Sequence, residues 1–314
     1  ASISGGVAEA IDVLASSPLR EKIGPLTKWH YTGQSRSDMH LEIPLIANQK
    51  PNSKGADYRI ISVINDAQLS MPSSPVELKD LSGTLEVSTE NGLYSNNLSA
   101  TLWQKPFNAT FFKADGQQKM ALKTTLSPIS LNKFVDFSWD EIVSGDLPVE
   151  GILDINLSEK ASLLKLKSSL QGVALNLPKP FDKPAEEIQA LDIILSFDPN
   201  FSRLQGNLGD RLQADLSFAE DRFQRGLVSY DRSPLSPEDG QLLVAIHLPT
   251  IEFDLWMPLL SKIQSSQKSK KTHWQPVFDL EFDYLTVAGL NLQAITAKVR
   301  ALQTGLNVAF ISNL

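Results

Sequence analysis

The sequence predicts a mainly β protein of antiparallel strands, with short helices and a repeat of about 110 residues. Three observations support this fold class. Apolar and polar residues alternate over most of the chain, helix signals are few, and one arrangement of strand, prolines and strand occurs twice. Alternation with a period of two places apolar side chains on one face of a strand, which is typical of antiparallel sheets that have one face in water.

Helix signals are confined to three stretches. Residues 7–29 are expected to hold two helices separated at Pro18, because proline interrupts a helix. Residues 127–145 are expected to hold one helix, and residues 251–264 a third that is interrupted near Pro258. The polar stretch SSQKSKK that follows is predicted to be a loop or linker.

Strands are predicted wherever the alternation is strict. In DMHLEIPL (residues 38–45), Met39, Leu41 and Ile43 share one face, whereas Asp38 and His40 lie on the other. The same pattern occurs at residues 163–170, 241–248, 277–284 and 290–310. Each of these strands is expected to have one apolar face and one face in water.

Two proline-containing stretches indicate an internal repeat. Residues 66–88 (DAQLSMPSSPVELKDLSGTLEVS) and 172–197 (GVALNLPKPFDKPAEEIQALDIILSF) each contain a strand, a proline interruption and a second strand, with Pro72 matching Pro178. Proline ends strand pairing because it offers no backbone N–H to the ladder. The repeat predicts one continuous elongated sheet rather than independent domains. Its units are predicted at residues 1–126 (helix then β-meander), 127–247, and 248–314 as the start of a third.

Composition excludes several classes of protein. The net charge of −7 and the isoelectric point near 5.2 argue against nucleic-acid binding, which requires a basic surface. Cysteine is absent, so disulfides and thiolate metal sites are excluded. No apolar run is long enough to cross a bilayer as a helix. Because the chain begins within a patterned stretch, we expect it to be a piece of a longer protein.

No motif indicates metal binding or nucleophilic catalysis. The histidines, among them His40 and His247 on the polar faces of strands, lack the spacing of metal ligands, so no metal and no cofactor are expected. The stretch GQSRS at residues 33–37 falls short of the G-x-S-x-G nucleophile elbow.

Charged side chains offer one weak alternative. Asp279, Glu281 and Asp283 lie on one strand face, and a carboxylate pair is what a glycan hydrolase needs. The simpler interpretation is the water-facing side of a strand. Four lysines are interpreted as solvating a face rather than as phosphate ligands: Lys165, Lys167, Lys179 and Lys183.

The predicted strands carry more apolar surface than the few helices can cover. A soluble protein does not leave that much apolar surface in water. The apolar faces therefore either pack on a second sheet, as in a β-sandwich, or hold something apolar. Sequence pattern alone leaves both alternatives open.

Several stretches resemble the YhdP family, the large members of the AsmA-like group of diderm bacteria. They include SPLREKIGPLTKWHYTGQSRSDMHLEIPL, IEFDLWMPLL and the closing FDLEFDYLTVAGLNLQAITAKVRALQTGLNVAFIS. The best copy of the family element G-x-x-L-x-L-P-x-P-x-x-K is formed by Gly172, Leu175, Leu177, Pro178, Pro180 and Lys183. The first copy departs from it, with Ser73 and Ser74 where Lys179 and Pro180 stand in the second.

The resemblance implies an elongated, twisted β-groove built from repeats, which carries phospholipid acyl chains between the inner and outer membranes. It places the full-length protein in the periplasm, tethered to the inner membrane. The implied partners are phospholipid and membrane components of the envelope, with no nucleic acid, and the chain itself is expected to be soluble and monomeric. It is not expected to be an enzyme. The residues expected to line the groove are Leu41, Ile43, Leu69, Met71, Leu85, Val87, Leu153, Ile155, Leu175, Leu177, Leu195, Phe197, Leu280 and Phe282.

Two other functions are weighed against the lipid path. A structural or interaction scaffold of stacked β-sandwiches in the envelope would need filled apolar cores and no lipid. An envelope glycan hydrolase would need Asp279 and Asp283 in a cleft.

Overall fold

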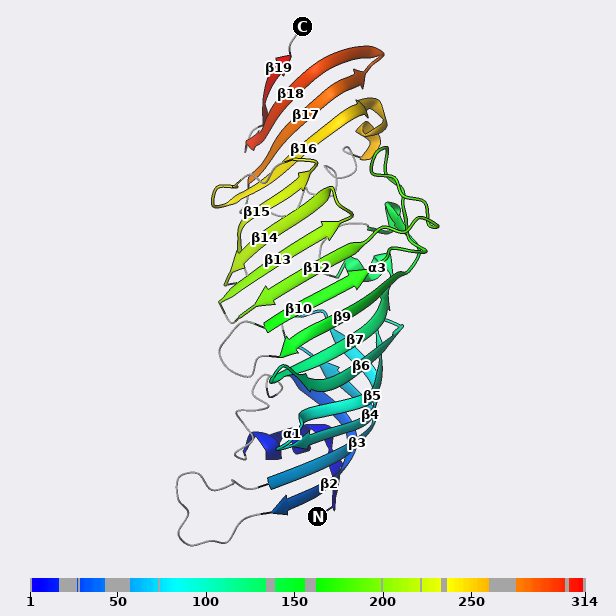
Figure 1. Cartoon of the computed structure of the whole chain (residues 1–314), viewed down its shortest axis with the longest axis vertical. Helices are drawn as coiled ribbons and strands as arrows, with labels where there is room; N and C mark the ends of the chain where they lie inside the picture. The colour runs from blue at the N-terminus through cyan, green and yellow to red at the C-terminus, as the bar shows by residue number, and fades with distance from the viewer. Residues whose placement is uncertain are drawn as a thin grey trace. The chain divides into compact units, whose positions relative to one another are not determined.

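The computed structural model confirms a mainly β fold, with 68% of the described residues in strands (Figure 1). It describes residues 2–16, 27, 29–42, 57–72, 74–133, 139–155, 162–198, 200–220, 222–232, 236–259, 275–302 and 305–312. The chain forms two compact units. Unit 1 comprises Ala1–Leu126 and Pro148–Leu164, and unit 2 comprises Ser127–Leu147 and Lys165–Leu314. The predicted division into three repeats stays a prediction.

Unit 1 is a meander of long antiparallel strands with one helix. Each strand pairs with the next in sequence from β1 and β2 through to β7, and β9 lies beside β7. The elements are β1 (Ser2–Gly6), α1 (Val7–Ala15), β2 (His30–Glu42), β3 (Asp57–Ser70), β4 (Glu77–Ser88), β5 (Gly92–Leu102), β6 (Lys105–Ala114), β7 (Gln117–Leu126) and β9 (Leu147–Ile155). Strand β10 (Ser162–Ser168) begins in unit 1 and ends in unit 2.

The strand register gathers apolar side chains on one face of unit 1. Residues paired across a ladder share a face, and Met39 pairs with Ile60, which pairs with Val87. Farther along, Phe111 pairs with Met120. We call this the apolar face of unit 1. It carries Met39, Ile60, Leu85, Val87, Leu93, Leu98, Ala109, Phe111, Met120 and Leu122.

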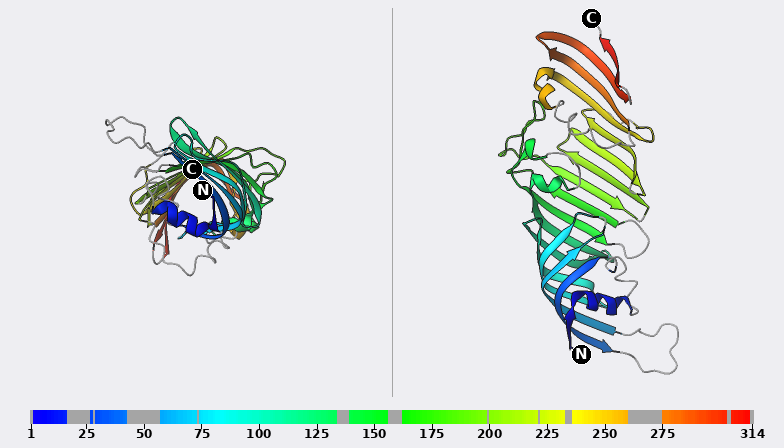
Figure 2. Two further views of the ribbon diagram at one scale, coloured as in Figure 1. Left: turned by 90° about the horizontal axis from the view of Figure 1, so that it is seen from below. Right: turned by 180° about the vertical axis from the view of Figure 1, so that it is seen from behind.

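Helix α1 covers only a small part of this face. Val7, at its first position, packs with Ile64 and Ala67 of β3 in a buried cluster, against which Tyr31 and Leu85 also pack. Figure 2 shows α1, in dark blue, against the strands of unit 1. This nine-residue helix, of about two and a half turns, leaves most of the face without a second layer among the described residues.

Unit 2 carries a second run of strands and more irregular segments. Strands β12 to β15 form an antiparallel meander, as do β17 to β19. The elements are α3 (Pro128–Leu131), η2 (Trp139–Glu141), β8 (Val143–Ser144), β11 (Ala174–Leu175), β12 (Leu191–Phe197), β13 (Phe201–Leu208), β14 (Leu212–Ala219), β15 (Arg222–Tyr230), β16 (Gln241–Glu252), η3 (Phe253–Leu255), β17 (Gln275–Val287), β18 (Leu290–Leu302) and β19 (Gly305–Ser312).

Two neighbouring pairs in unit 2 are parallel and are exceptions in a sheet that the sequence predicts to be mostly antiparallel. Strand β15 runs parallel to β16, and β16 runs parallel to β17. In both places the chain returns to the same end of the sheet before the next strand starts, so both strands run in one direction. Period-two alternation is the same for parallel and antiparallel strands, and it therefore carried no sign of this difference.

The described residues of the three predicted helical stretches contain short helices. In the first stretch, α1 ends at Ala15 and the second expected helix lies outside the described residues. The second stretch holds α3 and η2, and the third begins with η3. The predicted SSQKSKK loop also lies outside the described residues.

The two proline stretches differ in what they connect. Pro72 and Pro75 lie in the short connection between β3 and β4, which pair directly as a hairpin. Pro178 and Pro180 lie in a much longer segment between β10 and β12. Strand β11 of this segment pairs with β8, which precedes β9 in the sequence, in a separate two-stranded sheet. We call residues 169–190 the proline segment.

Lys183 holds the proline segment together, which corrects its interpretation as a solvated lysine. Its side chain is buried, and Nζ donates to the carbonyl oxygens of Leu170 (2.9 Å), Val173 (2.7 Å) and Pro184 (3.0 Å). Its own backbone pairs with Leu175 in both directions. Burial lowers the pKa of Lys183, against a smaller opposing effect from Glu187 and Glu186.

Replacing Lys183 with methionine is expected to lower the free energy of unfolding by about 1–3 kcal/mol, because buried carbonyls lose their donor. Lys179→Met, in the same segment but with an exposed side chain, is the matched control and should change stability little. Urea unfolding followed by circular dichroism measures both. Equal stability of the two variants would show that the hydrogen bonds from Lys183 to the three carbonyl oxygens do not stabilise the fold.

Gly33 is required by the backbone of β2. The β2–β3 register shifts there, its φ is +98°, and a Cβ would lie 2.5 Å from the Ala67 Cα. The GQSRS stretch is thus an irregular strand and not a nucleophile elbow.

Gly33→Ala is therefore expected to cost more than the roughly 1–2 kcal/mol that a positive φ alone costs an L-residue. Gly116→Ala tests the φ effect by itself, since its φ is +74° and nothing lies within 4 Å of the added Cβ. Thermal unfolding of both variants distinguishes the two contributions. A loss at Gly33 no larger than the loss at Gly116 would contradict the clash with β3.

Candidate functional site

An apolar face like that of unit 1 runs across the strands of unit 2. Leu195 pairs with Leu204, and Leu204 pairs with Leu216. Tyr230 pairs with Ile246 across the parallel ladder, and Ile246 with Leu280. Register thus places apolar side chains from β12 to β17 on one face, which we call the apolar face of unit 2. It carries Leu195, Phe197, Leu204, Leu216, Val228, Tyr230, Ile246, Leu248, Leu280 and Phe282.

Most of the predicted lining residues in unit 1 lie on its apolar face. Leu41 pairs with Tyr58 near the end of β2 and is 51% exposed. Leu85 and Val87 lie on β4. Leu153 and Ile155 of β9 alternate with Glu150 and Asp154, whose carboxylates pair with lysines on the opposite face of β7. Leu69 follows the bulge in β3 and lies on the same face of the strand as Ala67.

The four predicted residues on β12 and β17 share the apolar face of unit 2, but their surroundings differ. Phe197 is 40% exposed and Leu195 is half-buried. Phe282 is only 6% exposed because it belongs to a packed cluster, and Leu280 packs against that cluster. The open part of this face is therefore at β12 to β14, and the covered part at β16 and β17.

Four predicted lining residues do not lie on a described strand of either face. Met71 follows the last residue of β3. Leu175 lies in β11, paired with Val143 of β8, and Leu177 lies in the proline segment beyond it. Ile43 lies outside the described residues.

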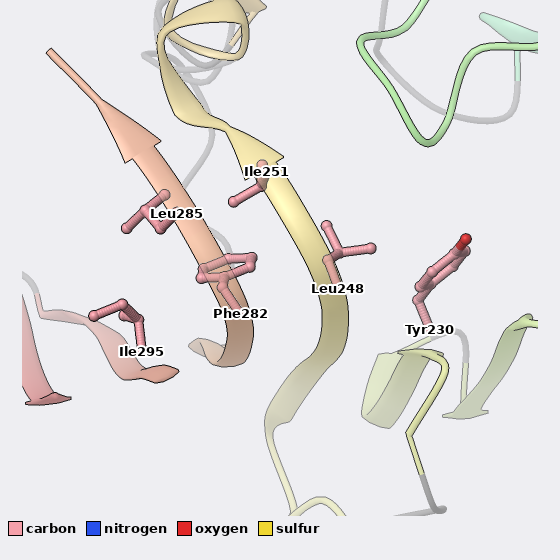
Figure 3. Close-up of a cluster of buried hydrophobic side chains, with 6 residues drawn as sticks. All are labelled: Tyr230, Leu248, Ile251, Phe282, Leu285 and Ile295. Carbon is pink, nitrogen blue, oxygen red and sulfur yellow. The ribbon is translucent and has the colours of Figure 1, made fainter. Parts of the chain in front are cut away.

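The covered part of the face is a dense apolar core (Figure 3). Its buried members include Leu248 and Ile251 of β16 and Phe282 and Leu285 of β17. Leu248 is 1% exposed. Neighbouring strands carry these side chains next to one another, so the core forms where the parallel pair and the η3 turn meet.

Aromatic residues from two irregular segments complete this core. The ring centroid of Phe181, in the proline segment, lies 4.8 Å from that of Tyr230 and 5.5 Å from that of Trp256. Trp256 directly follows η3, and Phe253 within η3 packs on the same core. Sequence reasoning did not assign these residues to the site, because periodicity says nothing about which strand a loop residue will cover.

The opposite faces of the sheets carry paired charges, together with some apolar residues such as Ala245 and Val277 of unit 2. In unit 2, Nε of Arg203 on β13 lies 2.8 Å from a carboxylate oxygen of Asp215 on β14. In unit 1, Lys123 of β7 lies 2.7 Å from Glu150 of β9. Charges on one side and apolar groups on the other give each sheet two chemically different faces.

Two of the three carboxylates of β17, those of Asp279 and Glu281, are engaged in ion pairs. Asp279 is 7% exposed, which corrects the expectation of a water-facing residue, and it lies 3.4 Å from Arg232 and 3.5 Å from Lys298. Arg232 also lies 2.9 Å from Glu281. These contacts tie the segment after β15 to β17, so the carboxylates serve the structure of unit 2.

The described residues contain no cluster of metal ligands. No group of three or more histidine, cysteine, aspartate or glutamate side chains in these ranges is arranged to hold an ion. His40 lies 3.0 Å from Glu42 and His247 lies 3.3 Å from Asp283, both at strand surfaces. Within the same ranges, no helix is long and apolar enough to cross a membrane.

Comparison with known proteins identifies relatives of the whole chain. A family model described as YhdP protein matches residues 1–311. The chain is 25% identical over 267 residues to the intermembrane phospholipid transporter YhdP of Escherichia coli (strain K12), over 78% of this chain and 20% of that protein. It thus spans about a fifth of the length of this curated relative. No solved structure matches.

The matched family is not a family of enzymes, which confirms the expectation that the chain has no catalytic role. The family model covers almost every residue, including the strands of both apolar faces. The resemblance based on the proline element is therefore confirmed, and the chain belongs to the YhdP family.

Proposed function

We propose that the chain is a section of a lipid-transfer path, in which phospholipid acyl chains lie on the apolar sheet faces between the inner and outer membranes. The named activity of its relative, intermembrane phospholipid transport, supports this proposal. The relative's place between two membranes also supports a periplasmic location, with membrane components of the envelope as partners.

The observation that carries the proposal is the exposure of apolar side chains on the faces where strand register gathers them. Leu41 in unit 1 is 51% exposed and Phe197 in unit 2 is 40% exposed. The alternative β-sandwich would cover such residues with a second sheet. Among the described strands, only the short β8 and β11 of unit 2 form a separate sheet, and no described strand of unit 1 does.

Such a face suits transport because it binds a whole acyl chain strongly, although each single contact with the chain is weak. Burial of one CH₂ group contributes about 0.8 kcal/mol, so an acyl chain gains binding energy along its whole length. Apolar contact is not directional, and displacement by one residue exchanges one contact for a similar one. The headgroup needs no dedicated site and no bond is made or broken.

Phe197→Asp is expected to weaken phospholipid binding about tenfold, because a carboxylate replaces an apolar contact on the open part of the face. Phe201→Asp is the matched control. Phe201 is 42% exposed on the neighbouring β13, but alternation places it on the opposite, polar face. Titration with a fluorescent phosphatidylethanolamine measures the affinity of each variant, and thermal unfolding confirms that both fold.

Equal loss of binding in the two variants would contradict a role for the apolar face. Absence of lipid binding by the unmodified chain would favour the alternative of a structural scaffold. Unfolding of Phe197→Asp but not of Phe201→Asp would also favour the scaffold, because it would show that Phe197 is part of a structural core.

A further inference from the structure

We propose that Phe181 and Trp256 form an aromatic gate over the apolar face of unit 2, which decides whether an acyl chain can reach β16 and β17. This inference rests on the proposed function and adds a control point to it. Both rings of the gate, together with Phe253, pack against the buried core that contains Leu248, Ile251, Phe282 and Leu285.

The covered and open parts belong to one face and differ only in what lies over them. Phe197 at β12 is 40% exposed, whereas Leu248 at β16 is 1% exposed. The strand register places Leu204, Leu216 and residues of β15 on the same face, between Phe197 and Leu248. An acyl chain on the open part therefore meets the covered part as it moves toward β17, and the aromatic side chains occupy the surface that it would use next.

The gate is built from two separately held segments whose aromatic rings are in contact. On one side, Phe181 sits at the tip of a turn closed by Leu175 and Lys183, where its backbone N–H donates to Pro178 O (3.1 Å). On the other side, η3 is held by Asp254, whose carboxylate accepts from the Ala288 N–H at 2.9 Å. These anchors keep each segment in place when the rings separate.

The contact between the two sides is a ring contact with no hydrogen bond across it. Phe181 meets Trp256 edge to face, with an interplanar angle of 90°. The Nε1–H of Trp256 is buried and has no hydrogen-bond partner among the described residues. A buried donor without an acceptor disfavours the closed arrangement, and opening would let that N–H reach water or a lipid ester oxygen.

Tyr230 forms the fixed side of the gate. It lies at the end of β15, where it pairs with Leu212 on one side and Ile246 on the other, so its position is set by the sheet rather than by the cover. In Figure 3, Tyr230 stands beside Leu248 at the border of the packed core. Displacement of Phe181 would therefore uncover the core at Tyr230 without disturbing the strands.

The test uses the 314-residue chain and vesicles of phosphatidylcholine that carry a diazirine on one acyl chain. Irradiation attaches the lipid to the residues that it touches, and mass spectrometry locates the adducts. The unmodified chain should be labelled on peptides of β12 to β14 and only at background on the peptide that contains Leu248. Phe181→Ala should raise labelling of that peptide roughly tenfold, because two aromatic contacts are lost.

Ile188→Ala is the matched control, since Ile188 belongs to the same proline segment but is 66% exposed, and it should leave the pattern unchanged. Trp256→Leu opens the gate from the other side and replaces Phe181→Ala if that variant fails to fold. Strong labelling at Leu248 in the unmodified chain would overturn the gate, as would background labelling there in both gate variants. Absence of adducts on β12 to β14 as well would overturn the proposed function, and the gate with it.

Discussion

The structure depends on one constraint, the alternation of side chains along extended strands. Because neighbouring residues point to opposite sides, strands as long as β2 and β3 collect apolar groups on one face and charges on the other. Ladder pairing then aligns these faces from strand to strand. A single layer of such strands has a large apolar surface. The helix of unit 1 and the irregular segments of unit 2 each cover part of that surface.

The two units cover it to different extents. In unit 1, one side chain of α1 packs into the sheet, and the apolar face ranges from buried at Ile60 and Val87 to half-buried at Met39 and Met120. In unit 2, irregular segments after β10 and after β16 place aromatic rings over the last strands. A packed core and an open apolar face thus occur on the same sheet, so the scaffold and lipid-path interpretations describe different parts of one unit.

The sequence predicted the faces better than it predicted their surroundings. Leu85, Val87, Leu195 and Phe197 follow strict alternation, and register gathers them with the apolar residues of neighbouring strands. Leu175 and Leu177 follow the same alternation, but their strand contributes only two residues to a small separate sheet. Alternation is a local property, whereas membership of a particular sheet depends on partners far away in the sequence.

The sequence by itself determined the mainly β class, the two-sided character of the strands and membership of the YhdP family, because all three depend on local residue patterns. Only the tertiary structure decided the parallel pairs of β15 to β17, the burial of Lys183 and Asp279, and the meeting of Phe181 with Trp256. Lys183 is buried by its own segment, whereas the other contacts join segments that are farther apart in the sequence. Periodicity does not record which residue will neutralise a charge or cover an apolar ring.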